Sequence, residues 1–550
     1  PLHRVAVLAL LALVALPVLA TAAMAMGALL DTEAWRALWL DTQWRRALGL
    51  SLWTGLASTA LAWWCSAALL AQGFVRRSLG RLLRGLPVML ATPHAAFAIG
   101  LVFLVAPSGW LLRLLSPWLT GFDFPPPWPT TQDPLGLGLI VALVAKEIPF
   151  LLWTAATQLQ RDDVRRRWQA EHTIAQTLGY APQRAFWRVV WPQLAPRLFW
   201  PLMAVLAYGL TVVDLALVIG PAAPPTLAVL AWQWLRDADL AINAQGAAAG
   251  GVLALAVLLL ALGWRGAQLA WTTLNRHTSG LRGQTRFTRH AAKLPWFFIA
   301  LASLYGTVLL ALAVGSVAGV WPFPNLWPER FTGQAWTSVW VSRGTVFNTL
   351  GLAAGAAALA LIWSVAWLEL APRRWDSALR PVLYLPLVLP AVLWVVGLYA
   401  LALQWRLEGQ WSGLLMAHTL MALPYVLLAL SPAYLGFDPR YAQLNASLGH
   451  GRWTLLWQIK WPLLRRALAA SAAVGFAVSV AQYLPTLYIG AGRFATVTTE
   501  AVTLAAGAQR SLTSAYAWLQ VVLPVLGFAL AAWVGRPRPF KVQDEPKNRS

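Results

Sequence analysis

Charged side chains are rare inside the long apolar segments of this chain, and these few are its first candidates for chemistry. Lys146 and Glu147 are adjacent in one such segment, and Asp214 lies in a later one. A charge placed in the hydrocarbon of a membrane is costly, and it often serves the movement of an ion or a solute. The simpler interpretation, which we favour for Lys146 and Glu147, is a bond from each side chain to a neighbouring helix.

The sequence gives no support to enzyme chemistry or to a bound cofactor. His94 and His418 are isolated, as expected of hydrogen-bonded packing residues rather than metal ligands, and the single cysteine, Cys65, lies in an apolar run. The Gly-x-x-x-x-Gly-Lys-Ser/Thr loop that cradles nucleotide phosphates is also missing. We therefore expect no enzyme activity, no metal and no cofactor bound by this chain, and any ATP would be used by a partner.

Composition predicts that the apolar segments cross a membrane. The 550 residues are 59% hydrophobic and only 11% charged, whereas a soluble chain carries about 25% charged residues. Runs near the ~20 residues that cross a bilayer are separated by polar or Pro/Gly-rich breaks. We predict an all-α membrane protein with about twelve spans, at 5–27, 48–72, 86–106, 135–158, 198–220, 246–271, 295–318, 346–368, 381–403, 411–431, 467–489 and 515–535.

Basic residues are distributed unevenly around these spans. With both termini inside, the inner segments hold 31 of the 42 Lys and Arg residues, the outer segments hold 10, and one lies within a span. This asymmetry predicts a multi-pass membrane protein with both termini cytoplasmic. The net charge of +22 then reflects topology and anionic lipid rather than nucleic acid. The first span ends like a signal peptide, but we expect it to be retained, because the second half also opens with a lone span.

Two polar loops carry the same short pattern, and an upstream pattern is also repeated. The loop residues that match at a distance of 270 positions are Thr173 with Gln443, Gly179 with Gly449, Trp187 with Trp457, Trp191 with Trp461, and Pro192 with Pro462. The upstream residues that match are Pro93 with Pro390, Gly100 with Gly397, and Leu50-Ser51-Leu52 with Asn348-Thr349-Leu350. We predict two parallel six-span halves, 1–271 and 295–535, joined by a basic linker at 272–294 and followed by a tail at 536–550.

The loops resemble the signature of the membrane subunits of type I ABC importers. In that signature a Gly follows a Glu-Ala-Ala motif by three residues and precedes a Pro by thirteen. Gly179 and Pro192 keep the latter spacing, as do Gly449 and Pro462. The fused arrangement looks like the permeases of the thiamine, ferric-iron and polyamine branch. The resemblance implies the type I permease fold for both halves and a place in the bacterial inner membrane.

The resemblance also implies partners for the first signature loop, about 158–197, and the second signature loop, about 433–466. Each would dock on one of two copies of a cytoplasmic ATPase, and a periplasmic binding protein would deliver a small solute to the outer face. Gly takes a positive φ at such a turn without strain, and Pro can start the helix that follows. Thr173 and Gln443 stand where the family has Glu, so we do not expect that carboxylate's ion pair here.

Four basic residues on the signature loops are further candidates for docking. They could meet acidic groups of a partner or lipid phosphate, or they could simply be positive-inside charges, which is the interpretation we favour for any single one. These residues are Arg184, Arg188, Arg452 and Lys460.

In this family the fifth and eleventh spans line the translocation path, so Asp214 and Gln482 are the candidates for it. The sequence shows no acid cluster of the kind expected for a strongly cationic solute. The alternative function is a twelve-helix ion-coupled secondary transporter, whose coupling charges would be Lys146, Glu147 and Asp214, all in the first half. A polytopic membrane enzyme fits less well, because clustered His or acidic residues at one interface are missing.

Overall fold

The computed structural model describes residues 2–160, 162–275, 294–507 and 509–536. Within them every named element is a helix. Eleven helices are long and apolar enough to cross a membrane, or twelve if one bent pair is a single span. This confirms the predicted all-α membrane protein with about twelve spans. Most of the predicted linker and nearly all of the tail lie outside the described residues, so the proposed division into halves and linker stays a prediction.

The helices are numbered in chain order. Those up to the linker are α1 Leu2–Gly27, η1 Ala28–Leu30, α2 Thr32–Leu40, α3 Trp44–Val75, α4 Leu79–Arg84, α5 Leu86–Ala91, α6 His94–Val105, α7 Trp110–Leu115, α8 Leu137–Gln160, α9 Asp162–Thr177, α10 Pro182–Ala185, η2 Phe186–Val190, α11 Trp191–Leu194, η3 Ala195–Leu198, α12 Phe199–Thr211, α13 Asp214–Ile219, α14 Leu227–Trp234 and α15 Leu240–Asn275. Those after it are α16 Leu294–Gly315, α17 Gln334–Val341, α18 Arg343–Leu370, α19 Arg373–Leu383, α20 Leu385–Val388, α21 Ala391–Gln404, α22 Trp411–Leu435, α23 Pro439–Ser447, α24 Arg452–Thr454, η5 Leu455–Lys460, α25 Trp461–Val480, α26 Leu484–Ile489, α27 Val497–Ala505 and α28 Arg510–Val534.

Four predicted spans need correction. The third, predicted at 86–106, is the span His94–Leu115, because the chain breaks at Thr92 and Pro93 and leaves α5 as a separate short helix. The ninth is a pair of helices, Arg373–Val388 and Ala391–Gln404, bent by 108°, and a proline at the junction explains the bend because it cannot continue the helical hydrogen bonds. The fifth and eleventh spans end at Thr211 and Val480, nine residues before the predicted ends. Hydropathy missed both ends, since the apolar run continues through a break into α13 and α26. Asp214 therefore starts a separate short helix rather than lying inside a continuous span.

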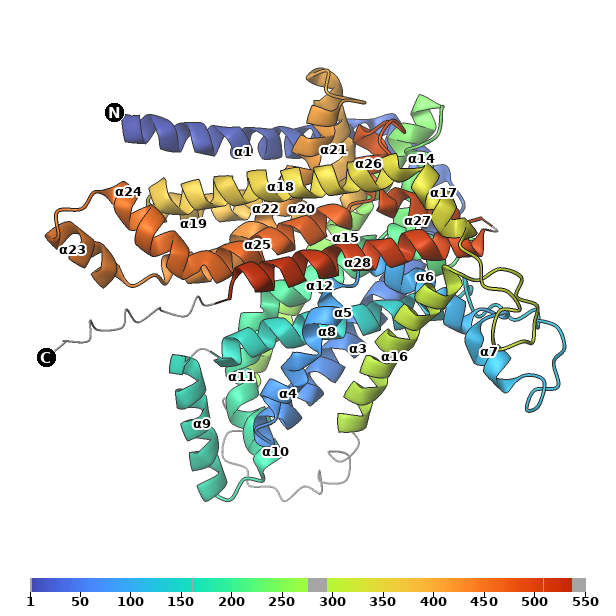
Figure 1. The fold of residues 1–550 in the computed structure, drawn as a ribbon, viewed down its shortest axis with the longest axis horizontal. Coiled ribbons are helices and arrows are strands. Elements are labelled where there is room, and N and C mark those ends of the chain that lie inside the picture. Colours follow the sequence, from blue (N-terminus) through green and yellow to red (C-terminus); the bar gives the residue numbers. More distant parts are fainter. Residues whose placement is uncertain (1, 161, 276–293, 508, 537–550) are drawn as a thin grey trace, which may run out of the picture.

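The first span of each half packs against the other half. Figure 1 shows α1 lying with the helices of the second half and α16 with those of the first, and their main contacts are α1 with α21 and α16 with α6. Two equivalent glycines allow the close approach. A Cβ on Gly100 would lie 2.7 Å from Val308 of α16, and one on Gly397 would overlap the Thr21 carbonyl of α1. We call this arrangement, in which the first helix of each half packs on the other half, the helix exchange. It explains why Gly recurs at the same place in both halves.

The halves share their irregular features as well as their helices. The short helices α13 and α26 start 270 positions apart, each after a break. Ser51 Oγ accepts a hydrogen bond of 2.9 Å from the N–H of Leu227, which starts α14. Thr349 Oγ1 likewise accepts a hydrogen bond of 2.9 Å from the N–H of Val497, which starts α27. Each side chain satisfies an N–H that a helix start leaves without an intrahelical partner, and the repeated bond supports the predicted internal duplication.

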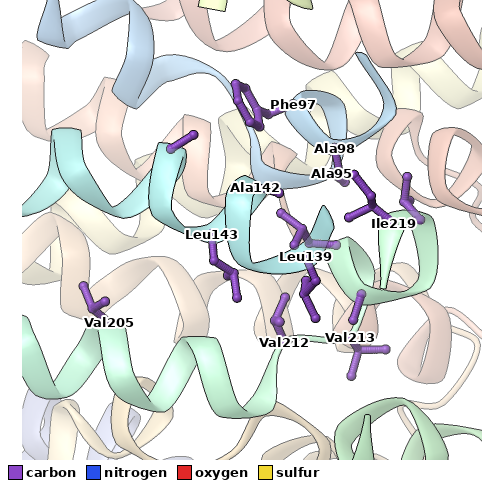
Figure 2. Packing of buried hydrophobic residues seen from close by; sticks show 14 of the residues in the cluster. Ala95, Phe97, Ala98, Leu139, Ala142, Leu143, Val205, Val212, Val213 and Ile219 are labelled. Atoms are coloured by element: carbon purple, nitrogen blue, oxygen red, sulfur yellow. The ribbon is translucent and has the colours of Figure 1, made fainter. Parts of the chain in front are cut away.

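The core of the first half lies where α6, α8 and the α12–α13 break meet. Figure 2 shows apolar side chains from these elements gathered there, and all belong to one buried cluster. Val212 and Val213, at the break itself, are buried in it. Figure 1 shows the two bundles diverging toward α9 and α23 and meeting at the end that carries α7 and α17. Apolar packing therefore buries the break within the core.

Candidate functional site

The first signature loop folds into two helices separated by a sharp turn. Gly179 follows α9 with a φ of +92°, as expected. The N–H of Tyr180 donates to the carbonyl of Ala175 at 3.1 Å, which is the six-residue bond of a Schellman helix end. His172 Nε2 lies 2.9 Å from the carbonyl oxygen of Pro182 and so ties α9 to α10 across the turn.

The second signature loop repeats this turn with a different clamp. Gly449 follows α23 with a φ of +75°, and the N–H of His450 donates to the carbonyl of Asn445 at 3.0 Å. Asn445 Nδ2 in turn donates to the carbonyls of His450 and Gly451, at 3.0 and 3.2 Å. Both signature glycines thus occupy the positive-φ turns that the sequence predicts.

A π-helical stretch follows each turn, and this was not predicted. In η2 and η5 the closing bonds span five residues, with the N–H of Trp191 and of Trp461 as their last donors. Pro192 and Pro462 come directly afterwards, in the first turn of α11 and α25. Pro supplies no N–H and crowds the carbonyl four residues back, so a wider turn before it relieves the conflict. Such π insertions are rare and occur mostly at functional sites.

Each signature loop also presents an exposed apolar pair just before its turn. Ile174 and Leu178 are 58% and 54% exposed, and Leu444 and Leu448 are 59% and 63% exposed. The two members of a pair are four residues apart, so they share one face of their helix. Sequence reasoning missed these residues, although they are apolar positions in polar helices and keep the same 270-residue offset as the glycines.

The other predicted loop residues lie around these pairs. Thr173 and Gln443 are exposed on α9 and α23, and the hydroxyl of Thr173 donates to the carbonyl of Gln169 at 2.9 Å. Arg188 is exposed on η2, and Arg184 is half-buried on α10. The positions of the missing signature carboxylates therefore face outward and carry only neutral side chains.

Glu171 serves the first signature loop internally. Its carboxylate accepts from Arg167 Nε at 2.8 Å and from Gln193 Nε2 at 2.7 Å. Gln193 also accepts from Trp168 Nε1 at 3.0 Å, so α9 is bonded to α11. The hydrogen bonds from Arg167 and Gln193 hold the pKa of Glu171 below its usual value. The Glu171 carboxylate is thus engaged within the loop. Two residues before Thr173 on the same helix, it faces nearly the opposite way and is no simple replacement for the signature Glu.

An acid at the end of α18 anchors the second signature loop. Glu369 pairs with Arg452 at 3.0 Å and with Lys460 at 2.6 Å, and it accepts from the Tyr434 hydroxyl at 2.8 Å. A carboxylate of the same chain thus engages both Arg452 and Lys460, two of the four basic candidates on the signature loops. The network ties the loop to a membrane-spanning helix.

Titratable groups from four helices of the first half converge near the α12–α13 break. His94 Nε2 lies 3.6 Å from Glu147 Oε1, and the His94 ring lies 4.6 Å from the ring of Tyr208. Asp214 interacts electrostatically with both His94 and Tyr208. The His94 side chain is 35% exposed and that of Glu147 only 7%. Glu147 and Asp214, two acids far apart in the sequence, thus both interact with His94.

Two tyrosines of the second half lie within electrostatic range of this group. Tyr425 of α22 interacts electrostatically with Glu147 and is 37% exposed. Tyr483, in the break before α26, interacts with Asp214 and with Arg236. We call the set His94, Glu147, Tyr208, Asp214, Tyr425 and Tyr483 the central polar cluster. It contains residues from both halves and lies beside both helix breaks.

Comparison with known proteins decides the family. Residues 359–537 match the family of binding-protein-dependent transport system inner membrane components. Over 545 residues, 96% of both chains, the sequence is 33% identical to the inner membrane ABC transporter permease protein YnjC of Escherichia coli K12. The chain belongs to the ABC importer permeases. It is also 27% identical to the thiamine transport system permease protein ThiP of Salmonella typhimurium, over 84% of each chain, and 25% identical to the molybdenum transport system permease protein ModB of Mycobacterium tuberculosis, over 36% of this chain and 77% of that one.

Membership has direct consequences for this permease. It is a multi-pass inner membrane protein that forms the membrane component of an importer, and it is not an enzyme. The interpretation as an ion-coupled secondary transporter is not retained. Members of the family work with an ATPase and a substrate-binding protein, which supply the energy and the solute. In the part of the permease that the structure describes, no group of three His, Cys, Asp or Glu residues could hold a metal ion.

Lys146 of the permease has a structural partner on a neighbouring helix, as we favoured. Its ammonium donates to the carbonyls of Met89 and Thr92, at 2.9 and 2.5 Å. The carbonyl of Met89 would normally accept from the residue four positions on, but that residue is Pro93, which has no N–H. The ammonium of Lys146 thus supplies the hydrogen bond that is missing at the break between α5 and α6.

His418 bridges the α25–α26 break of the second half, which corresponds to the α12–α13 break of the first. Its two ring nitrogens lie 2.8 Å from Ser479 Oγ, before the break, and 2.9 Å from Thr486 Oγ1, after it. The Thr486 hydroxyl donates to the carbonyl of Gln482 at 3.1 Å, so it accepts from His418 Nε2, and Nδ1 accepts from Ser479. This confirms that His418 is a hydrogen-bonded packing residue. Gln482 itself lies within the break and is half-buried.

Proposed function

We propose that this permease forms the path by which a small solute enters the cell, and that each signature loop docks on one of two ATPase subunits. The observation that carries the proposal is the duplicated apolar pair. Ile174 and Leu178 repeat as Leu444 and Leu448, each pair exposed beside a positive-φ glycine. Exposed apolar side chains that recur on two rigid turns suit the groove of a partner present in two copies. A periplasmic binding protein would dock at the opposite end, near α7 and α17.

A mutation in each pair tests the docking. We expect Ile174→Asp with Leu444→Asp to reduce solute uptake and stimulated ATP hydrolysis by about tenfold or more, since losing a central apolar anchor costs about 2 kcal/mol or more. The measurement is ATPase activity of the permease purified with its ATPase and reconstituted in liposomes, beside uptake.

Ile174→Met with Leu444→Met is the matched control, because methionine keeps the apolar contact at both sites. Full stimulation in the aspartate variant, with the ATPase still bound, would show that these faces do not couple the two proteins.

We further propose that the solute is cationic and crosses at the central polar cluster. Glu147 and Asp214 bring two carboxylates to it, whereas Lys146 is turned to backbone carbonyls. Tyrosine rings beside carboxylates suit an organic cation. The name of one relative records thiamine, a cation, and that of another molybdenum. The charges favour a thiamine-like solute, a polyamine or ferric iron over an oxyanion.

Binding to the purified full-length permease tests the charge of the solute. We expect thiamine or spermidine to bind more tightly than molybdate, and Asp214→Asn to weaken the binding of that cation by about tenfold, the value of a hydrogen bond to a charged group. Isothermal titration is the measurement, with Asp31→Asn, an acid that caps α2, as the control. Tighter binding of molybdate than of either cation would contradict the proposal.

A further inference from the structure

A pocket of about 510 Å³ lies at the end of the molecule opposite the signature loops. Trp110 and Arg113 of the first half line it together with Gln334 and Arg510 of the second. In Figure 1 the elements that carry these residues, α7, α17 and the start of α28, lie together at the right. The pocket is separate from the central polar cluster and from both signature loops.

Arg113 brings a buried charge to this pocket and is only 5% exposed. Its guanidinium donates from Nε to the carbonyl of Ser108 at 2.9 Å, and from Nη2 to that of Trp321 at 3.0 Å. Nη1 donates to the carbonyls of Pro322 and Asn325, both at 2.7 Å. All four acceptors are neutral, and one N–H of the guanidinium's five remains. No carboxylate among the described residues forms an ion pair with Arg113.

A second guanidinium lines the same pocket. Arg510 is the exposed first residue of α28, and it interacts electrostatically with Arg113. It therefore adds positive charge at a helix start, where the unpaired N–H groups already favour an anion. Two like charges that share a pocket repel each other unless an anion lies between them. The charge of the pocket thus calls for an anionic ligand.

The position of the pocket identifies the kind of anion. It lies at the ends of three spans, His94–Leu115, Trp296–Gly315 and Arg510–Val534, and the apolar windows of the last two are each only 28% buried. Beside the pocket these two spans are buried, at Gly315 and at 513–517, and their exposed stretches lie toward the opposite ends. Trp110 contacts the rings of Trp321 and Trp327, at 6.0 and 5.6 Å, and such aromatic groups mark the membrane–water interface.

We propose that this pocket binds the phosphate of an anionic phospholipid in the leaflet opposite the signature loops. Arg510 contacts the phosphate, and Arg113 supplies a fixed positive charge behind it. Phe103, Ala311 and Leu512 also line the pocket, and they give the acyl chains an apolar wall. Because Arg113 bonds to residues of the 321–325 loop, the site joins the first half to the second.

The experiment uses the full-length permease, delipidated in detergent and titrated with phosphatidylglycerol or phosphatidylcholine under native mass spectrometry. We expect one phosphatidylglycerol to bind about tenfold more tightly than phosphatidylcholine, and Arg510→Gln to remove that preference. The matched control is Arg343→Gln. Arg343 is an exposed arginine at the start of α18 that does not line the pocket, so its loss should leave the preference unchanged.

Other outcomes would overturn the assignment to lipid. Equal affinity for the two lipids, or an unchanged preference in Arg510→Gln, would remove the pocket as a lipid site. Displacement of phosphatidylglycerol by millimolar inorganic phosphate would show a site for free anions. If Arg510→Gln binds phosphatidylglycerol normally but loses solute uptake, Arg510 contacts a protein partner rather than a lipid. If Arg510→Gln does not fold, the lipid preference of the wild-type protein and its loss at high salt decide instead.

Discussion

At the scale of single residues, Gly179 and Gly449 are the positions of the signature loops where the backbone most clearly requires glycine. Their φ angles of +92° and +75° lie in the left-handed region, where a Cβ is strained. Space does not limit them, because a Cβ at either position would meet nothing within 4 Å. A larger residue would therefore act by redirecting the turn that carries the exposed apolar pair, and not by a clash.

We predict that Gly179→Val or Gly449→Val uncouples ATP hydrolysis from uptake while the protein still inserts. The left-handed conformation costs a β-branched residue on the order of 1–2 kcal/mol, which a long helical bundle tolerates. ATPase activity and uptake of the reconstituted complex are the measurements. Gly451→Val is the matched control, since Gly451 lies in the same loop with φ −75° and open space around it. Normal uptake in both variants would remove these glycines from the coupling mechanism.

Single residues also show how far sequence reasoning reaches. The positive φ of the two glycines was predictable, because a local turn demands it. The pairing of Glu369 with Lys460 was not, since the partners are 91 positions apart in the chain and either charge alone looks like an ordinary loop charge. Glu147 and His94 meet for the same reason, through the packing of α8 on α6. Local rules predict turns, whereas the central polar cluster depends on tertiary structure.

At the scale of elements, the permease is organised by its exchanged first helices and its broken spans. The repeated residues predict a duplication, whereas nothing in the sequence indicated the packing of α1 and α16 on the opposite half. Hydropathy also failed to locate the breaks after Thr211 and Val480, because α13 and α26 are as apolar as the spans before them. The recurring glycines Gly100 and Gly397 are the sequence feature that accompanies the helix exchange, because the exchanged helices approach closely there.

Replacing either exchange glycine tests this packing. We predict that Gly397→Leu or Gly100→Leu lowers the stability of the purified permease by about 1–3 kcal/mol, the usual cost of overpacking. The new side chain must displace the α1 backbone near Thr21 or Val308 of α16. Thermal unfolding in detergent is the measurement. Gly306→Leu on α16 is the control, because a Cβ there meets nothing within 4 Å. Equal melting temperatures for all three variants would contradict the exchange of helices.

At the scale of the whole molecule, a single chain gives two similar halves different chemistry. The acids of the central polar cluster come from the first half, whereas the second has Met421 and Ala422 at the positions equivalent to Lys146 and Glu147. The signature loops differ too, since His172 clamps one turn and Asn445 the other. A homodimer could not separate these roles, because each change would appear twice. Fusion thus permits an asymmetric path within a symmetric frame.

The orientation of this frame is the last prediction. The basic asymmetry places the linker, both signature loops and both termini in the cytoplasm, and the start of α1 lies at the same end of the second bundle as α23 and α24 (Figure 1). In a Cys65→Ser background, we expect Gly283→Cys, in the linker outside the described residues, to react with an impermeant maleimide only after permeabilisation. Asp123→Cys, exposed between α7 and α8, should react in intact cells. The reverse pattern would invert the map, and the signature loops would then face away from any cytoplasmic ATPase.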